Sequence, residues 1–152
     1  MKTIYPDNFT KDDIFNNQTI SKKRGLGGED KIHKEFCKTL QQYESYNQTN
    51  ILCWSYIASG EHRNKITANL LKAKGVKRGW GDYVILSDID NTGIMHVIFI
   101  EFKYGKNKQS EYQVGFQNDL KQSQCLNVHY QVCYSVDEAI EYLQMLGAVK
   151  HN

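Results

Sequence analysis

The sequence contains only one proline and four cysteines in 152 residues, and it contains no long apolar run. No stretch approaches the roughly 18 consecutive apolar residues that a membrane-spanning helix requires, so we expect no membrane span. Residues 1–13 also lack the apolar core of a signal peptide. We therefore expect a cytoplasmic protein, whose length fits one domain able to bury its own core.

Closely spaced cysteine pairs are also absent. Zinc sites and dithiol redox sites usually use such pairs, so neither kind of site has support. Each cysteine lies in an apolar neighbourhood, and we predict that all four are reduced core residues. They are Cys37, Cys53, Cys125 and Cys133.

A strong net charge is missing as well, because 19 basic and 17 acidic residues give only +2. The distribution of charge is more informative than the sum. Residues 63–78 include six basic residues and no acidic one. Such a stripe suits a polyanionic partner, although a solvated helix face has the same composition. The six residues are Arg63, Lys65, Lys72, Lys74, Lys77 and Arg78.

Apolar periodicity predicts the order of helices and strands. Residues 1–28 are polar and aperiodic, so we expect an arm there, followed by one domain at 29–152. The pattern predicts helices at 29–44, 65–74, 110–124 and 135–147, and strands at 51–57, 83–86, 96–104 and 128–134. This order predicts an α/β fold with a four-stranded mixed sheet flanked by helices.

Candidate catalytic residues lie on two strands that a short turn makes neighbours. Asp82 precedes the second strand, whereas Glu101 and Lys103 lie near the end of the third. Side chains alternate along a strand, so Glu101 and Lys103 share a face. The start of one strand lies beside the end of the other, and we expect all three side chains to meet there. Glu-x-Lys is usually a solvated pair, but here it follows a buried run, where an unpaired charge is costly.

Such a trio suits metal-dependent phosphodiester hydrolysis. Two carboxylates form an oxygen site for Mg²⁺ or Mn²⁺, to which the backbone carbonyl of Phe102 can add a ligand. A bound metal ion lowers the pKa of water and polarises the scissile phosphate. A nearby lysine orients that water or stabilises charge on phosphate oxygens.

Two further polar residues lie on apolar helix faces. Glu29 continues the stripe of Ile32 and Phe36 at the start of the first helix, where it either reaches the site or complements the helix dipole. Gln113 follows Ser110 by three residues, which is the spacing of a capping box. Because Gln113 also shares a face with Phe116, a capping role and a role in the site both remain open.

Together these residues resemble the VRR-Nuc domain, a branch of the PD-(D/E)xK nuclease superfamily. The resemblance covers about residues 29–143, most of the chain. It rests on the order and spacing of several segments, which are Glu29 with Ile32, residues 60–63, the run 71–79 leading to Asp82, Glu101-Phe102-Lys103, Ser110-x-x-Gln113 and residues 135–140.

The resemblance implies an αβββαβ core and DNA cleavage that depends on Mg²⁺ or Mn²⁺. It makes Asp82, Glu101 and Glu29 members of the metal site, Lys103 the catalytic lysine and Gln113 a residue that lines the site. Stand-alone relatives of this size, often from phages and bacteria, are homodimers that cut branched DNA, including four-way junctions. The expected compartment is then the cytoplasm of a bacterial or phage-infected cell.

One departure from the family pattern is Gly81, which stands where the family has proline before the acid. Glycine permits a looser loop at this position. The alternative to an endonuclease is therefore a non-catalytic nucleic-acid-binding module on a nuclease scaffold. A protein-interaction domain with a tyrosine-rich surface is the third hypothesis, because the chain has 10 tyrosines.

Overall fold

The computed structural model describes residues 27–57, 65–89 and 91–151, which form an α/β fold around a four-stranded mixed sheet. Each predicted helix and strand in this part of the chain is present, and no bound differs by more than two residues. The elements are α1 (Gly28–Ser45), β1 (Ile51–Tyr56), α2 (Lys65–Ala73), β2 (Tyr83–Ser87), β3 (His96–Phe102), α3 (Glu111–Gln122), β4 (Val128–Cys133) and α4 (Val136–Leu146). The predicted arm at 1–28 lies outside the described residues except for Gly27 and Gly28, and Gly28 already belongs to α1.

The sheet has the strand order β1-β2-β3-β4. The first three strands are antiparallel, and β4 is parallel to β3. Tyr83, the first residue of β2, pairs with Ile100 of β3. This register places the start of β2 beside the end of β3, as the short turn predicts.

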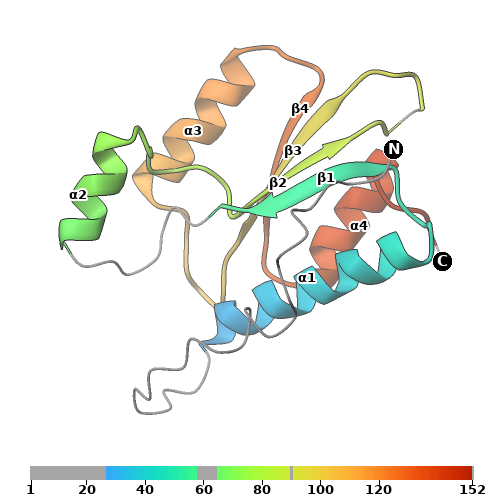
Figure 1. Ribbon diagram of the computed structural model, residues 1–152, viewed down its shortest axis with the longest axis horizontal. Coiled ribbons are helices and arrows are strands. Elements are labelled where there is room, and N and C mark those ends of the chain that lie inside the picture. The colour runs from blue at the N-terminus through green and yellow to red at the C-terminus, as the bar shows by residue number, and fades with distance from the viewer. Residues whose placement is uncertain (1–26, 58–64, 90, 152) are drawn as a thin grey trace, which may run out of the picture.

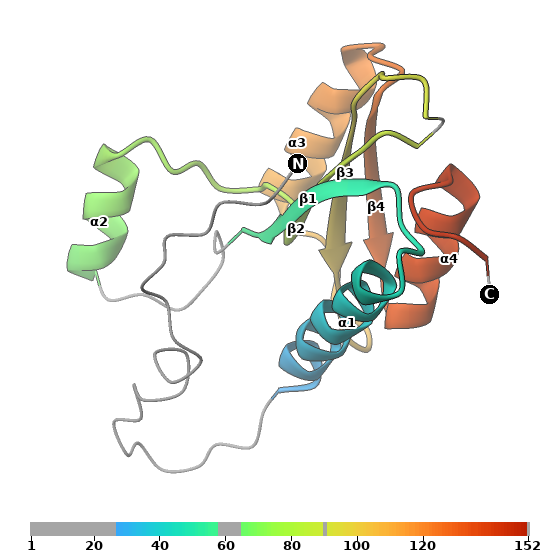
Figure 2. The same cartoon turned by 45° about the vertical axis from the view of Figure 1, so that its right-hand side comes forward.

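Helices cover both faces of the sheet. Helices α1 and α4 lie on one face and α3 lies on the other (Figures 1 and 2). On the first face, the ring of Phe36 lies 5.0 Å from the rings of both Tyr83 and Phe102. On the second face, Phe116 of α3 packs against Phe99 at 5.1 Å. Each sheet face therefore has its own aromatic contact with a helix.

Strand β3 is buried on both sides, which explains its continuous apolar run. Ile98, Ile100 and Phe102 belong to the core cluster that contains Phe36, and all three are fully buried. Full burial of one such side chain stabilises the fold by about 1.5–3 kcal/mol relative to leaving it exposed. The strand that carries Glu101 is thus held firmly at the centre of the sheet.

Strand β1 is an edge strand with most of its side chains exposed. The prediction that all four cysteines lie in the core is wrong at Cys53, because β1 is an edge strand and the residue is exposed. It is also wrong at Cys125, which is exposed just beyond α3. Cys37 is half-buried and only Cys133 is fully buried. An apolar neighbourhood does not ensure burial where helices do not cover the strand. All four thiols are free.

Helix α2 stands to one side of the sheet, beyond the ends of β1 and β2 (Figures 1 and 2). No helix among the described residues is long and apolar enough to cross a membrane.

Candidate metal centre

Asp82 lies immediately before β2 and is joined to the end of β3. Its Oδ2 accepts a hydrogen bond of 2.7 Å from the backbone N–H of Phe102. This bond fixes the carboxylate and still leaves lone pairs for a cation. Because the N–H and C=O of one strand residue point the same way, the Phe102 carbonyl faces the Asp82 side as well. The structure therefore brings together the two strand ends that the sequence predicts to meet.

Glu101 and Lys103 share the opposite side of β3 from Phe102. The carboxylate of Glu101 is fully buried, and its Oε1 accepts hydrogen bonds from Lys103 Nζ and Gln113 Nε2. Lys103 lies just beyond the strand and is 8% exposed. Glu101 Oε2 is buried and has no hydrogen-bond partner among the described residues. A buried carboxylate oxygen without a donor is costly unless a proton or a cation supplies the missing charge.

Gln113 fills both of the roles that its position in the sequence leaves open. Its Oε1 accepts the backbone N–H of Ser110 at 2.8 Å, and Ser110 Oγ accepts the backbone N–H of Gln113. These two bonds complete the capping box at the start of α3. The amide nitrogen of Gln113 remains available and donates to Glu101. The helix cap therefore orients a donor toward the buried acid.

Crowded carboxylates dominate the electrostatics of the centre. The pKa of Glu101 is raised to about 7, because burial and the nearby charge of Asp82 raise it more than Lys103 lowers it. The pKa of Asp82 is also raised, mainly by burial, although the Phe102 N–H and the charge of His33 oppose the shift. Both carboxyls therefore lack full compensation for their negative charge.

Glu29 approaches the centre from the first turn of α1. One of its carboxylate oxygens lies within 4.8 Å of donor atoms of His33 and Asp82. The adjacent Gly28 positions this turn, because a Cβ there would lie 2.3 Å from the ring of Tyr104. A larger residue at this position would require the exposed side chain of Tyr104 to move.

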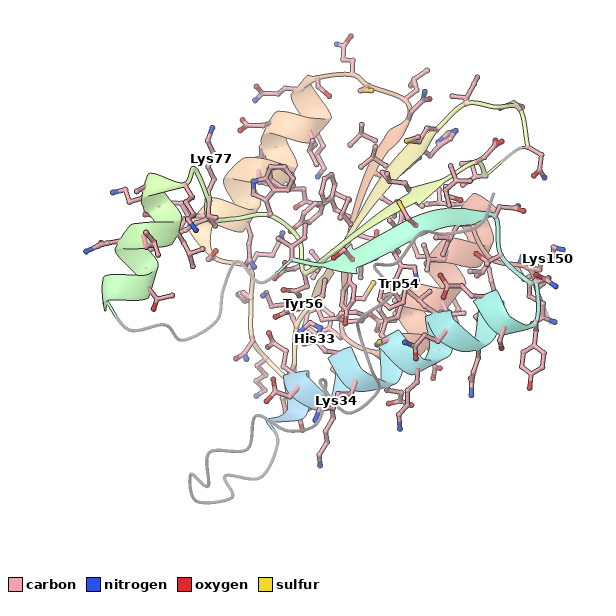
Figure 3. The ribbon with its side chains drawn as sticks, in the orientation of Figure 1. His33, Lys34, Trp54, Tyr56, Lys77 and Lys150 are labelled. Carbon is pink, nitrogen blue, oxygen red and sulfur yellow. The ribbon has the colours of Figure 1, made fainter. Side chains whose placement is uncertain are left out.

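His33 is the one residue of this cluster that sequence reasoning missed. It lies one helical turn after Glu29, on the same side of α1, and its Nε2 is 3.9 Å from Asp82 Oδ2. The i, i+4 spacing of Glu29 and His33 is the signal that would have identified it. Figure 3 shows His33 beside Tyr56, between α1 and β1.

Gly81 has a packing role beside β3. The residue is buried, and a Cβ there would lie 3.2 Å from both the carbonyl oxygen of Ile100 and the Cβ of Phe99. Any larger residue would push β3 away by a few tenths of an ångström. Glycine thus allows a close approach to β3 one residue before Asp82.

The described basic residues of the predicted stripe lie on and after α2. Four of them are exposed, namely Lys72, Lys74, Lys77 and Arg78. Arg78 contacts α3, because its guanidinium carbon lies 5.7 Å from the centre of the Tyr112 ring. Arg63 and the side chain of Lys65 lie outside the described residues.

The donor set fits a divalent cation. The ammonium group of Lys103 pairs with Glu101, and the charges of Asp82 and Glu29 act on the same carboxyl. Donor atoms of Glu29, His33 and Asp82 lie within 4.8 Å of one another. A divalent ion would compensate this excess of negative charge, and Glu101 Oε2 has an unused lone pair for it.

Comparison with known proteins finds no matching family, no matching curated protein and no matching solved structure. The described residues define an α/β fold with acidic side chains and a histidine near the start of β2 and the end of β3.

Proposed function

We propose that this protein is a metal-dependent deoxyribonuclease that hydrolyses phosphodiester bonds on a PD-(D/E)xK restriction-endonuclease-like core. The observation that carries the proposal is the Glu101 carboxylate, which is fully buried with one oxygen unpartnered among the described residues. It lies beside Asp82 and is bonded to Lys103. The element order is compatible with an αβββαβ core, to which α2 and α4 are additions.

In this proposal, Asp82, Glu101 and Glu29 hold Mg²⁺ or Mn²⁺, and the Phe102 carbonyl supplies a further oxygen. The bound ion supplies a water molecule of lowered pKa and polarises the phosphate. The hydrogen bond from the Phe102 N–H orients Asp82, and the hydrogen bond from the Gln113 side chain orients Glu101.

Lys103 has the position of a charge-stabilising residue. Its ammonium group donates to Glu101 Oε1 and, as a rotatable donor, can turn to a phosphate oxygen. Burial strengthens this interaction because water screens it little. Lys103 therefore orients the attacking water or stabilises the negative charge that develops on the phosphate.

The exposed cations on and after α2 provide a surface for the DNA backbone. Lys72, Lys74, Lys77 and Arg78 are exposed and positively charged, which suits contacts to phosphate groups. With the family resemblance, they support a nuclease that selects branched DNA, such as four-way junctions. A two-fold homodimer would present two centres to two opposed strands.

A cleavage assay tests the proposal directly. The full chain is incubated with four-way junction, flap and linear duplex DNA, in Mg²⁺, in Mn²⁺ or with a chelator. We expect cutting only with metal and fastest cutting of the junction. Asp82→Asn keeps an acceptor for the Phe102 N–H but removes a charge, and Lys103→Gln keeps a donor near Glu101. We expect each to reduce the cleavage rate by at least about 10²-fold.

Binding measured beside cleavage separates the alternatives. Both variants should still bind junction DNA within a few-fold of the wild-type affinity, because neither residue belongs to the exposed basic set. Metal-independent DNA binding without cutting of any substrate would instead indicate a non-catalytic binding module. Weak DNA binding that does not depend on salt would favour a protein-interaction domain.

A further inference from the structure

His33 faces the acidic centre with a geometry that no hydrogen bond explains. Its Nε2 and Asp82 Oδ2 are 3.9 Å apart, which exceeds hydrogen-bond length. Two donors that each lie about 2.1 Å from one ion are separated by at most about 4.2 Å. The observed distance is therefore one that two ligands of a single ion can have.

The donors come from elements that fix their separation. Glu29 and His33 are four residues apart on α1, so their side chains leave the same side of the helix. Asp82 is held at the end of the sheet by its bond to Phe102. Donor atoms of all three residues lie within 4.8 Å of one another.

The imidazole ring is held in place by aromatic neighbours. The rings of Tyr56, Phe102 and Tyr83 lie 5.3, 5.5 and 5.7 Å from it, and the side chain is 15% exposed. Its Nδ1 is buried and has no partner among the described residues. A ring fixed in this way presents its other nitrogen to Asp82 with little freedom to turn elsewhere.

A second, independent observation points to a cation near this set of donors. Glu101 is fully buried, and its Oε2 lacks a partner within the described part of the chain. The charges of both Asp82 and Glu29 act on this carboxyl. The unpartnered oxygen of Glu101 therefore lies within electrostatic reach of the three-donor set.

We propose that His33 is a metal ligand beside Glu29 and Asp82, and that its imidazole makes the centre selective for Mn²⁺ over Mg²⁺. The inference rests on the metal centre of the proposed function and adds a nitrogen ligand to it. Mg²⁺ prefers oxygen ligands and gives up its water reluctantly, whereas first-row transition-metal ions accept imidazole.

Pulsed electron paramagnetic resonance on Mn²⁺ bound to the full chain tests the proposal without measuring activity. A coordinated imidazole produces a nitrogen hyperfine coupling at the ion. We expect this coupling in the wild type and its loss in His33→Gln, with Mn²⁺ binding weakened at least about tenfold by calorimetry. Mg²⁺ binding should change much less.

His96→Gln is the matched control, because His96 is also buried and begins β3 at the end opposite Glu101. It should keep both the coupling and the affinity. If His33→Gln does not fold, the four other histidines are replaced one at a time, and a coupling that survives every replacement identifies His33 by elimination.

Three outcomes would overturn the proposal. Bound Mn²⁺ without nitrogen coupling in the wild type refutes His33 as a ligand, while metal-dependent cutting would leave the nuclease proposal standing. Equal weakening of Mn²⁺ and Mg²⁺ in His33→Gln refutes the selectivity. Failure of both ions to bind the wild type removes the metal centre and the proposed function together.

Discussion

Gln113 shows how one side chain connects local helix chemistry to the buried acid. Its carbonyl oxygen accepts the Ser110 N–H, and its amide nitrogen donates to Glu101. The oxygen of a side-chain amide accepts and its nitrogen donates, so the two bonds use different atoms and do not compete. Ser110 takes part only in the cap, and the two roles can therefore be separated by substitution.

The variants Ser110→Ala and Gln113→Ala should have similar free energies of unfolding but clearly different cleavage rates. Loss of the Ser110 hydroxyl removes one capping bond and should lower the free energy of unfolding by about 1 kcal/mol. Gln113→Ala should cost a similar amount, and it also leaves Glu101 with one donor fewer. We expect cleavage to fall at least about tenfold in Gln113→Ala and to stay within a few-fold in Ser110→Ala.

Urea denaturation and cleavage rates measured on the same preparations check this expectation. Equal losses of activity in the two variants would mean that Gln113 acts through the cap and not through Glu101.

At the scale of elements, the segment between α2 and β2 is held against the start of α3. Gly79 has a φ of +94°, and a Cβ there would lie 2.3 Å from the carbonyl oxygen of Tyr112. Trp80 stacks on Phe116 of α3, with ring centres 5.2 Å apart. Asp82 is two residues beyond Trp80, and Gln113 is the residue after Tyr112. These contacts therefore help to position Asp82 relative to Gln113.

Gly79→Ala should therefore destabilise the protein more than Gly75→Ala. Both glycines have a positive φ, but a Cβ at Gly75 would meet nothing within 4 Å. Gly75→Ala should cost about 1–2 kcal/mol for the left-handed backbone alone. Gly79→Ala adds a clash with backbone, which should cost about 1–3 kcal/mol more.

Chemical denaturation of both variants measures the difference in unfolding free energy. Equal destabilisation would contradict close packing of this segment on α3.

At the scale of the whole molecule, charge is distributed unevenly although the net charge is only +2. Lys77 lies on the side of α2, whereas Lys150 lies at the opposite end, near the last turn of α1 (Figure 3). If the side of α2 binds DNA, the salt dependence of binding should change with Lys77 and not with Lys150.

Lys77→Gln should weaken junction binding a few-fold at low salt. Each lost phosphate contact should lower the slope of log K against log salt by about 0.9. Lys150→Gln is the matched control and should leave the slope unchanged, and anisotropy titrations with chelator present measure both. Equal slopes in the wild type and both variants would place the DNA interface elsewhere.

The sequence by itself determined the element order and the pairing of the two strand ends. Apolar periods of about 3.6 and 2 residues are local properties, so they predict α1 and β3 without knowledge of the fold. The short connection after β2 makes the strands neighbours, which brings Asp82 beside β3. The capping box of Gln113 is equally local, because it depends on a spacing of three residues.

Only the tertiary structure decided which side chains are buried and which distant residues meet. Cys53 lies in an apolar run but is exposed, because β1 forms the sheet edge. His33 joins Asp82 only through the packing of α1 on the sheet, a contact between residues 49 positions apart. That Glu101 Oε2 has no partner among the described residues is likewise a consequence of tertiary packing. Burial and unpartnered polar atoms depend on what surrounds a residue, and local sequence patterns do not specify those surroundings.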